Sequence, residues 1–174
     1  LRAAGGFGWV MAHNEEIIAK GSGSVKGSRE QMSSFWSGVT GLASAMKVLE
    51  TVAETLQVGV TVDLHTDNQA LVNRMTKLNQ HDPNNALLRN DYDMYWVIRK
   101  ARKAVKILET RHVRGHQDRT GNNLSFLEKL NVLADELATE AAEKAKIEEP
   151  EWSTELPPTL KIRGKTVTKR EASC

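Results

Sequence analysis

One stretch of strand-like sequence is followed at once by helical sequence, and this order limits the folds open to the chain. The stretch VGVTVDLHT (58–66) is rich in β-branched residues and predicts a buried strand. Helical spacing begins directly after it, and a second strand-like run, KILETRHV (106–113), follows further helical sequence. Strands separated by helices are joined by crossover connections, which favour parallel pairing. The chain therefore predicts a mixed α/β sheet covered by helices.

The other segments complete the order β-β-α-β-α-α-β-α. The runs GGFGWVMAH (5–13) and EIIAKGSGSV (16–25) are separated by two residues, which is typical of a hairpin. Apolar residues at helical spacing predict a helix over 35–50. A longer helix is predicted through LLRNDYDMYWVIRKARKAV (87–105), and the strongest helix pattern covers 126–145.

The composition changes after Pro150, so we predict two regions of unequal size. The first, 1–148, is a single α/β domain, in line with the total length of 174 residues. The second, 149–174, is a C-terminal extension in which LKIRGKTVT (160–168) resembles a small hairpin.

Charge and cysteine content exclude several classes of protein. The 24 Lys and Arg residues nearly balance 22 Asp and Glu, so the net charge of +2 does not by itself demand a polyanionic partner. The single cysteine, Cys174, excludes an internal disulfide framework and predicts an intracellular, reducing compartment. No apolar run approaches the roughly 18 residues needed to span a membrane, and no signal peptide is recognisable.

Three polar residues stand where a ligand site is expected. Ligands of α/β sheets gather at the carboxyl ends of strands, and Asp67 directly follows the predicted strand 58–66. A helix N-cap is an equally good interpretation of Asp67, because a helix N-terminus favours a carboxylate. His116 lies just beyond the predicted strand 106–113. A lone loop histidine, however, is more often structural. Asp135 interrupts an apolar helix face, and a charge near an apolar surface is costly unless it is paired or binds a cation. Two carboxylates that meet at one sheet edge would suit Mg²⁺.

The motifs HTDNQALV, HVRGHQD and LNVLADELA carry a family resemblance, in this order and spacing. Over about residues 5–145 the chain resembles the ribonuclease H-like superfamily, and most of all the ribonuclease H domain of retroelement reverse transcriptase polyproteins. The resemblance implies a five-stranded mixed sheet of order 3-2-1-4-5 flanked by helices. It also implies a metal-dependent endonuclease for the RNA strand of RNA–DNA hybrids, with Mg²⁺ or Mn²⁺ as cofactor. The catalytic residues would be Asp67, His116 and Asp135, of which the two aspartates would bind the metal.

The predicted helix 35–50 departs from that family at a glycine. Gly38 and Gly41 both lie within it, where glycine is less favourable than alanine by about 1 kcal/mol. Alignment through MSSF places Gly38 where the family carries its catalytic glutamate, so Gly38 is interpreted as the position of a lost metal ligand. Close approach of a neighbouring backbone is the alternative explanation for either glycine.

A second departure concerns the family's first strand, which supplies the central metal-bridging aspartate and is absent from this chain. That strand is the middle of the sheet, and its loss would leave the flanking strands with unsatisfied backbone groups. We therefore expect a segment upstream of Leu1, or another chain, to fill the central position. Direct pairing of the flanking strands would contradict this expectation.

With two of four carboxylates missing, we predict an impaired active site. The family mechanism places two Mg²⁺ ions about 4 Å apart between the carboxylates. Asp67 and Asp135 would hold one ion weakly. Glu30 and Asp118 are conceivable substitutes, but neither occupies a matching position.

A nucleic-acid interface is predicted in RKARKAVK (99–106), whose basic residues lie on and around one predicted helix. A solvated helix face is an equally good interpretation of any single lysine. Trp36 is the candidate for stacking on a base, whereas Trp9 and Trp96 are predicted to lie in the core. The full predicted interface comprises Ser33, Ser34, Asn68, Arg99, Lys100, Arg102, Lys103 and Lys106.

Two classes of function follow. The first is a ribonuclease H-like domain that interacts with nucleic acid, either an RNA–DNA hybrid or structured RNA, and that is catalytically impaired. The second is a non-catalytic binding or scaffolding subunit of a ribonucleoprotein or other assembly. The retained Asp67, His116 and Asp135 favour the first by descent, and Gly38 with the missing strand favours the second.

Overall fold

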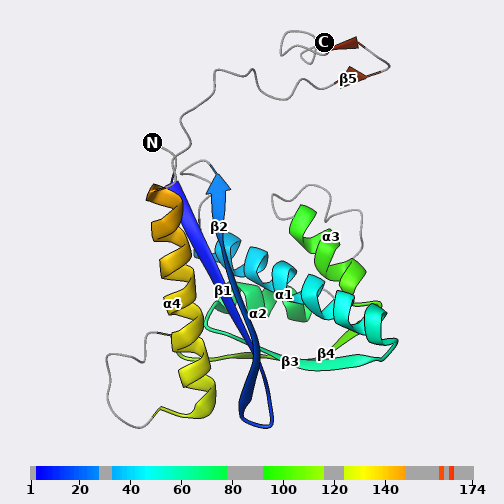
Figure 1. Cartoon of the computed structure of the whole chain (residues 1–174), viewed down its shortest axis with the longest axis vertical. Coiled ribbons are helices and arrows are strands. Elements are labelled where there is room, and N and C mark those ends of the chain that lie inside the picture. The colour runs from blue at the N-terminus through cyan, green and yellow to red at the C-terminus, as the bar shows by residue number, and fades with distance from the viewer. Residues whose placement is uncertain are drawn as a thin grey trace.

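The computed structural model describes residues 3–27, 33–77, 92–115, 124–147, 161–162 and 165–166, and it confirms the predicted α/β class and element order (Figure 1). None of the helices in these ranges is long and apolar enough to cross a membrane. The elements are β1 (Ala3–His13), β2 (Glu16–Gly27), α1 (Ser34–Leu56), β3 (Val60–Thr66), α2 (Gln69–Lys77), α3 (Tyr92–Ala101), β4 (Val105–His112), α4 (Phe126–Ile147), β5 (Lys161–Ile162) and β6 (Lys165–Thr166).

The strands β1 and β2 form the predicted antiparallel hairpin. His13 pairs with Glu16 across a two-residue turn, and both turn residues have positive φ angles, 50° for Asn14 and 61° for Glu15. Two positive φ angles match the turn type whose twist fits a two-residue hairpin. The local sequence thus fixes both the turn and the pairing.

The strands β3 and β4 form a parallel pair that begins at Val60 and Val105 and ends at Thr66 and His112. Within the described ranges this pair is not hydrogen-bonded to the β1–β2 hairpin. In the family's own strand numbering, the β1–β2 hairpin matches the neighbouring strands 2 and 3 of the predicted order 3-2-1-4-5. The β3–β4 pair matches the neighbouring strands 4 and 5. No described strand occupies the central position between them, and β1 and β3 are not paired with each other.

Helix α1 begins one residue before the predicted start and ends six residues beyond the predicted end. Ser33 is its N-cap and accepts a hydrogen bond from the Trp36 N–H at 3.2 Å. Its buried side chains, including Val39 and Met46, pack with those of α2, α3 and the start of β4 to form the core.

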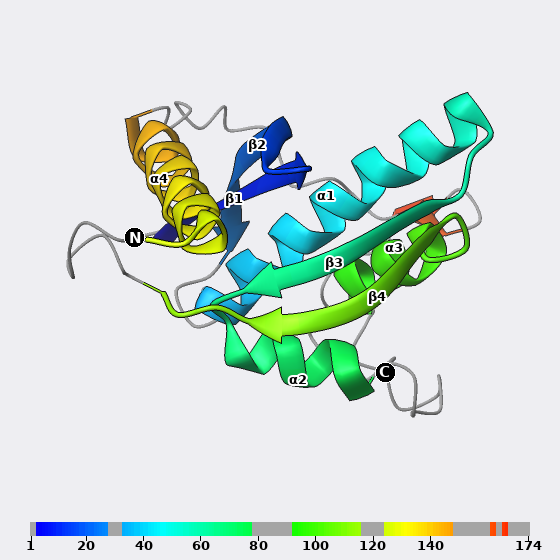
Figure 2. The same ribbon diagram turned by 90° about the horizontal axis from the view of Figure 1, so that it is seen from below.

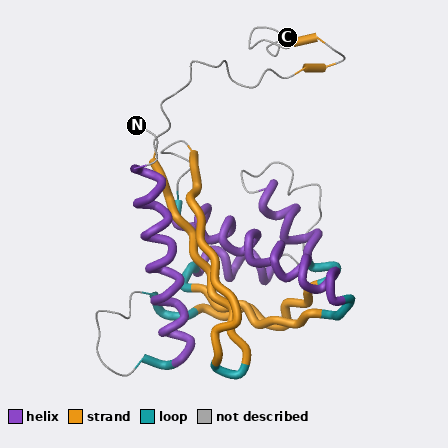
Figure 3. The backbone as a smooth tube through the Cα atoms, in the orientation of Figure 1, coloured by secondary structure: helices purple, strands orange, loops and turns teal. Residues whose placement is uncertain are grey.

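Small residues let two helices approach the hairpin closely, and Figure 3 shows α4 running alongside it. A Cβ atom added at Gly41 of α1 would lie 3.3 Å from the Cβ of Phe7 on β1. On the opposite face, Cβ atoms at Gly6 and Gly8 would overlap the backbone of α4 at Ala138 and Ala134. The hairpin is therefore a layer between α1 and α4, and close approach explains Gly41.

Helix α3 ends at Ala101, so the prediction that it continues to residue 105 was wrong; residues 87–91 lie outside the described ranges. The Arg102 N–H still donates to the Ile98 carbonyl at 3.0 Å, but residues 102–104 form a turn. Val105 is fully buried and pairs with Val60 on β3. Sheet pairing therefore overrides the helical propensity of the basic segment.

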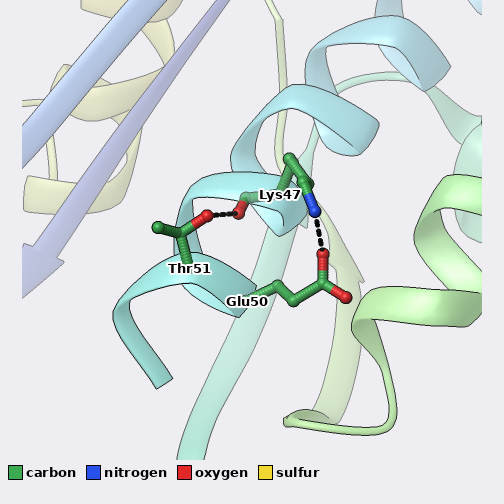
Figure 4. A network of polar contacts seen from close by, with 3 residues as sticks. All are labelled: Lys47, Glu50 and Thr51. Carbon is green, nitrogen blue, oxygen red and sulfur yellow. Dashed lines mark hydrogen bonds and ion pairs between the residues drawn. The ribbon is translucent and has the colours of Figure 1, made fainter. Parts of the chain in front are cut away.

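Glu50 of α1 is the buried charged residue of the described core, and Lys47 neutralises it (Figure 4). Lys47 Nζ lies 2.6 Å from Glu50 Oε2, and this hydrogen bond is the main reason why the pKa of Lys47 is raised. Thr51 donates to the Lys47 carbonyl at 3.0 Å.

In the C-terminal region, Lys161 pairs with Thr166 in a two-stranded antiparallel pair, as the predicted hairpin requires.

Candidate functional site

Asn68, not Asp67, caps helix α2. The Asn68 Oδ1 atom accepts a hydrogen bond from the Leu71 N–H at 3.0 Å, and the Thr66 hydroxyl accepts one from the Asn68 N–H at 3.2 Å. The capping role considered for Asp67 therefore belongs to its neighbour. Asp67 therefore lies at the carboxyl end of β3 without the capping role considered for it.

The end of β4 lies beside Asp67. His112 pairs with Thr66 across the sheet, and its Nε2 atom lies 3.0 Å from the Asp67 carbonyl oxygen. A Cβ atom added at Gly115 would lie 2.7 Å from Asp67 Oδ2, so the backbone after β4 passes directly against the carboxylate. No sequence pattern pointed to His112, because its contact depends on the register of β3 and β4. His116 lies outside the described residues.

Gly38 faces the same junction from helix α1. A Cβ atom at this position would lie 3.3 Å from Asn68 Nδ2 and 3.6 Å from a methyl group of Leu71. Gly38 therefore lies beside Asn68, the residue that follows Asp67 and caps α2. Close approach also accounts for this glycine in part, and its interpretation as a lost ligand stays a prediction.

Asp135 of α4 and Asp67 line one large groove. A groove of about 1290 Å³ runs between β1 and β3, and we call it the β1–β3 groove. Asp67, Asp135 and Gly38 all line it, as do the predicted interface residues Ser34 and Asn68. The fold thus brings two predicted site carboxylates, from elements far apart in sequence, to one groove.

The described residues supply fewer metal ligands than the full family site needs. Among them, no group of three or more His, Cys, Asp or Glu side chains is placed to hold a metal ion. Asp67 and Asp135 are two carboxylates, and Mg²⁺ in proteins is often held by one or two carboxylates together with phosphate oxygens and water. Glu30 and Asp118 lie outside the described ranges.

A capping box holds the N-terminus of α4 in place. Glu128 Oε2 accepts hydrogen bonds from the Ser125 N–H at 2.8 Å and the Ser125 hydroxyl at 2.7 Å, and the Ser125 Oγ atom accepts one from the Glu128 N–H at 3.3 Å. These bonds lower the pKa of Glu128, with a smaller contribution from the charge of Arg114. The spacing Ser-x-x-Glu just before an apolar run was the available signal for this motif.

We predict that Ser125→Ala destabilises the protein near neutral pH and has less effect at acid pH. A lowered pKa means that Glu128 contributes stability above its ordinary pKa, and that this contribution is lost as the pH falls through the folded-state pKa. Urea unfolding of the wild type and Ser125→Ala should therefore differ at neutral pH and converge in acid. Equal differences at both pH values would contradict the assignment.

Helix α3 ends in an exposed face that is both basic and aromatic. Arg99, Lys100 and Lys103 are exposed, and Arg102 is half-buried. Trp96 is 55% exposed, so the prediction that it belongs to the core was wrong. Arg99 and Lys100 follow it by three and four residues, which places them next to it on the helix surface. Its core-facing neighbours are the buried side chains at 95, 98 and 101. Trp9, by contrast, is partly buried, and its Nε1 donates to Ser44 at 3.1 Å.

This basic face and the Asp67 junction lie at opposite ends of the same strand. Strand β4 begins at Val105, beside the basic turn, and ends at His112, beside Asp67. Its eight residues span about 23 Å at about 3.3 Å per residue. Lys106, near the start of β4, is exposed at the basic end. One strand of a duplex, which rises about 3.4 Å per nucleotide, covers this distance in about seven nucleotides.

Comparison with known proteins identifies the fold. No protein-family model matches the chain, and no curated protein sequence matches it. Among solved structures it is similar to LC11-RNase H1 in complex with an RNA/DNA hybrid, with a TM-score of 0.55 and 16% identity over 81% of this chain and 87% of that one. The chain has a ribonuclease H-like fold. The prototype foamy virus protease-reverse transcriptase gives a TM-score of 0.47 and 13% identity, over 81% of this chain and 20% of that one.

The ribonuclease H-like fold explains the distribution of the site residues. Asp67 follows one inner strand of the sheet, and Asp135 lies on the helix that packs on the other strand pair. Both line the β1–β3 groove.

Proposed function

We propose that this ribonuclease H-like domain binds RNA–DNA hybrids and does not cleave them efficiently. The observation that carries the proposal is the shared groove, in which Asp67 from the end of β3 and Asp135 from α4 line one surface. The similar RNase H1 structure contains an RNA/DNA hybrid, which supports this class of ligand. The exposed Trp96 and basic side chains of α3 supply a second contact region of suitable chemistry.

In this proposal Asp67 and Asp135 would hold one divalent ion, Mg²⁺ or Mn²⁺. A bound ion would supply charge that neutralises a phosphate oxygen of the nucleic acid. The protein's own part is to fix the two carboxylates: Asn68 caps α2 beside Asp67, and the Ser125–Glu128 box anchors the helix that carries Asp135. We also propose a role in this site for His116, which directly follows Gly115 in the sequence.

Impaired cleavage follows from the chemistry at Gly38. Two-metal hydrolysis needs carboxylates that hold both ions in fixed positions on either side of the phosphodiester. Gly38 faces the Asp67 junction but offers no ligand atom. Loss of a ligand changes the charge and the geometry of the site together, and cleavage depends on both. Binding through phosphate contacts does not need a second metal ion.

The alternative function is a non-catalytic scaffolding subunit of a ribonucleoprotein or other assembly. It is favoured by the small number of acidic ligands in the described part of the site. In that case the groove and the basic face would contact protein or structured RNA. The experiment below separates this alternative from hybrid binding.

We predict that the chain retains a labelled RNA–DNA hybrid and that cleavage in Mg²⁺ or Mn²⁺ is not detected. The measurement is gel retention and product analysis on the same samples, with double-stranded DNA and single-stranded RNA of the same sequence as competitors. Asp67→Asn removes one negative charge at constant size, so retention in Mg²⁺ is expected to fall several-fold, whereas retention in EDTA stays unchanged.

Three other results would change the conclusion. Cleavage that Asp67→Asn abolishes would show an active nuclease and overturn the proposed impairment. Absence of retention for all three nucleic acids would favour the scaffolding subunit. Equal retention of hybrid and double-stranded DNA would contradict hybrid recognition.

A further inference from the structure

The backbone carbonyl of Asp67 lies between the last bond of the β3–β4 ladder and the first bond of helix α2. The Thr66 carbonyl accepts from the Val113 N–H at 2.9 Å, which closes the ladder. The Asn68 carbonyl accepts from the Val72 N–H at 3.1 Å, as the carbonyl of an N-cap residue does. Within the described ranges no backbone N–H donates to the carbonyl between these two. A backbone acceptor in this position needs a donor from a side chain or from water.

His112 supplies that donor from the neighbouring strand. Its Nε2 atom lies 3.0 Å from the Asp67 carbonyl oxygen. A carbonyl oxygen only accepts, so Nε2 carries the hydrogen of this bond. Figure 2 shows that β3 and β4 end at the same edge of the pair, where the chain leaves β3 for α2. The side chain at the end of one strand therefore binds the link between the other strand and its helix.

Thr66 binds the other end of the same peptide group. The Asn68 N–H, which belongs to the peptide that joins Asp67 to Asn68, donates to the Thr66 hydroxyl at 3.2 Å. Thr66 and His112 are partners in the β3–β4 register, which makes their side chains neighbours at the end of the sheet. Two neighbouring side chains thus hold the N–H and the C=O of one peptide.

Both peptide groups that flank the Asp67 Cα atom are therefore held. The preceding one is bound through its carbonyl to Val113, and the following one is bound by Thr66 and His112. Peptide groups are planar and leave two soft dihedral angles per residue, so holding both planes fixes the direction of the Cα–Cβ bond. This direction brings the carboxylate against the chain after β4, since a Cβ atom at Gly115 would lie 2.7 Å from Asp67 Oδ2.

We propose that His112 is a positioning residue that fixes the orientation of the Asp67 carboxylate. Its bond is to the main chain of Asp67, so it acts through the direction of the carboxylate and not as a metal ligand. The inference rests on the proposed function, in which Asp67 holds a divalent ion. Residues that orient metal ligands typically change metal affinity about 10- to 100-fold when they are replaced.

Glutamine and asparagine at position 112 separate the hydrogen-bond donor from the imidazole ring. The side-chain amide nitrogen of glutamine is as many bonds from Cα as Nε2 of histidine, and both can donate. The amide nitrogen of asparagine is one bond closer to the backbone and falls short of the Asp67 carbonyl. His112→Gln therefore keeps a donor at the same reach, and His112→Asn removes it. Both variants lose the imidazole.

The first measurement is amide hydrogen exchange by NMR on the full 174-residue chain in EDTA. The reporting amides belong to Asn68 and Leu71, because one bond is donated by the Asn68 N–H and the other is accepted by the Asn68 side chain. We expect exchange at both to be about fivefold faster in His112→Asn, the factor for one hydrogen bond of ordinary strength, and unchanged in His112→Gln. Exchange at the core residue Met46, which reports global unfolding, should stay the same in both variants.

The second measurement is Mn²⁺ affinity, followed by the EPR signal of free Mn²⁺ without nucleic acid. We expect His112→Asn to bind Mn²⁺ about tenfold more weakly and His112→Gln to retain the affinity. Asp67→Asn is the reference for loss of a ligand. His13→Asn is the matched control, because it removes an exposed histidine of β1 that also lines the β1–β3 groove, and its affinity is expected to be unchanged.

Four other results would change the conclusion. Weaker Mn²⁺ binding in both His112 variants, with exchange as in the wild type, would make His112 a metal ligand and overturn the positioning role. Wild-type exchange and affinity in His112→Asn would overturn it as well. Faster exchange at Met46 would show that His112 only stabilises the fold. If Asp67→Asn leaves Mn²⁺ affinity unchanged, the proposed metal site fails, and exchange at Asn68 and Leu71 then decides separately whether His112 fixes Asp67.

Discussion

Replacing Gly8 of β1 with alanine is expected to lower the free energy of unfolding by about 1–3 kcal/mol, the range for overpacking a tight interface. The added Cβ atom would overlap the backbone carbonyl of Ala134 and would lie 2.9 Å from the Cβ of Leu137. A backbone atom cannot turn aside as a flexible side chain can. The whole of α4 would have to move away from the hairpin. Urea unfolding monitored by circular dichroism measures the change.

Gly59→Ala is the matched control. A Cβ atom at Gly59 would meet nothing within 4 Å, and this residue is not among those with a strained positive φ. The same substitution there is expected to leave stability unchanged or raise it by a few tenths of a kcal/mol, through reduced freedom of the unfolded chain. A Gly8→Ala variant as stable as Gly59→Ala would show that α4 does not pack on β1 as described. Because α4 carries Asp135, Gly8→Ala should also weaken any binding that depends on that carboxylate.

The class and order of the elements were predictable because they depend on local patterns. The β-branched run ending at Thr66 and the two-residue turn at Asn14 each report a backbone preference within a few residues. The same holds for Ser33, whose capping role depends only on the next three residues. Local chemistry is sufficient for these features.

Features that depend on register or on packing could not be predicted. Val105 ends helix α3 early because it pairs with Val60, 45 residues away in sequence. His112 reaches Asp67 only through the register of β3 and β4. Trp96 was placed in the core because of its residue type, yet the helix turns it outward while Ile98 takes the buried position. In each case a distant partner decides the outcome.

The two glycines of α1 show how far packing resolves a question that the sequence raises. Gly41 contacts Phe7 of β1, which explains its small size without reference to function. Gly38 faces Asn68 and Leu71, where the Asn68 amide would have to shift by a few tenths of an ångström to admit a Cβ atom and the Leu71 methyl group would be in ordinary contact. A larger side chain is thus not excluded by backbone at Gly38. The space is compatible with a side chain having once been there.

The exposed basic face of α3 is expected to dominate the salt dependence of hybrid binding. The triple variant Arg99→Ala/Lys100→Ala/Lys103→Ala removes three exposed cations, two at the end of α3 and one in the turn that follows it. Each phosphate contact contributes about 0.9 to the slope of log K against log salt, so the slope should become less steep by about 3. Over a fourfold change in salt this amounts to about 40-fold in affinity. Titration of a labelled hybrid at several salt concentrations measures the slope.

A second triple variant separates local contact from net charge. Lys20, Lys129 and Lys144 are exposed on β2 and α4, and replacing them with alanine changes the net charge by the same amount. Long-range attraction alone would reduce affinity equally in both variants, because it depends on total charge. Direct phosphate contacts would reduce the slope only in the α3 variant. A reduced slope in the Lys20/Lys129/Lys144 variant alone would move the nucleic-acid interface from α3 to the opposite layer of the fold.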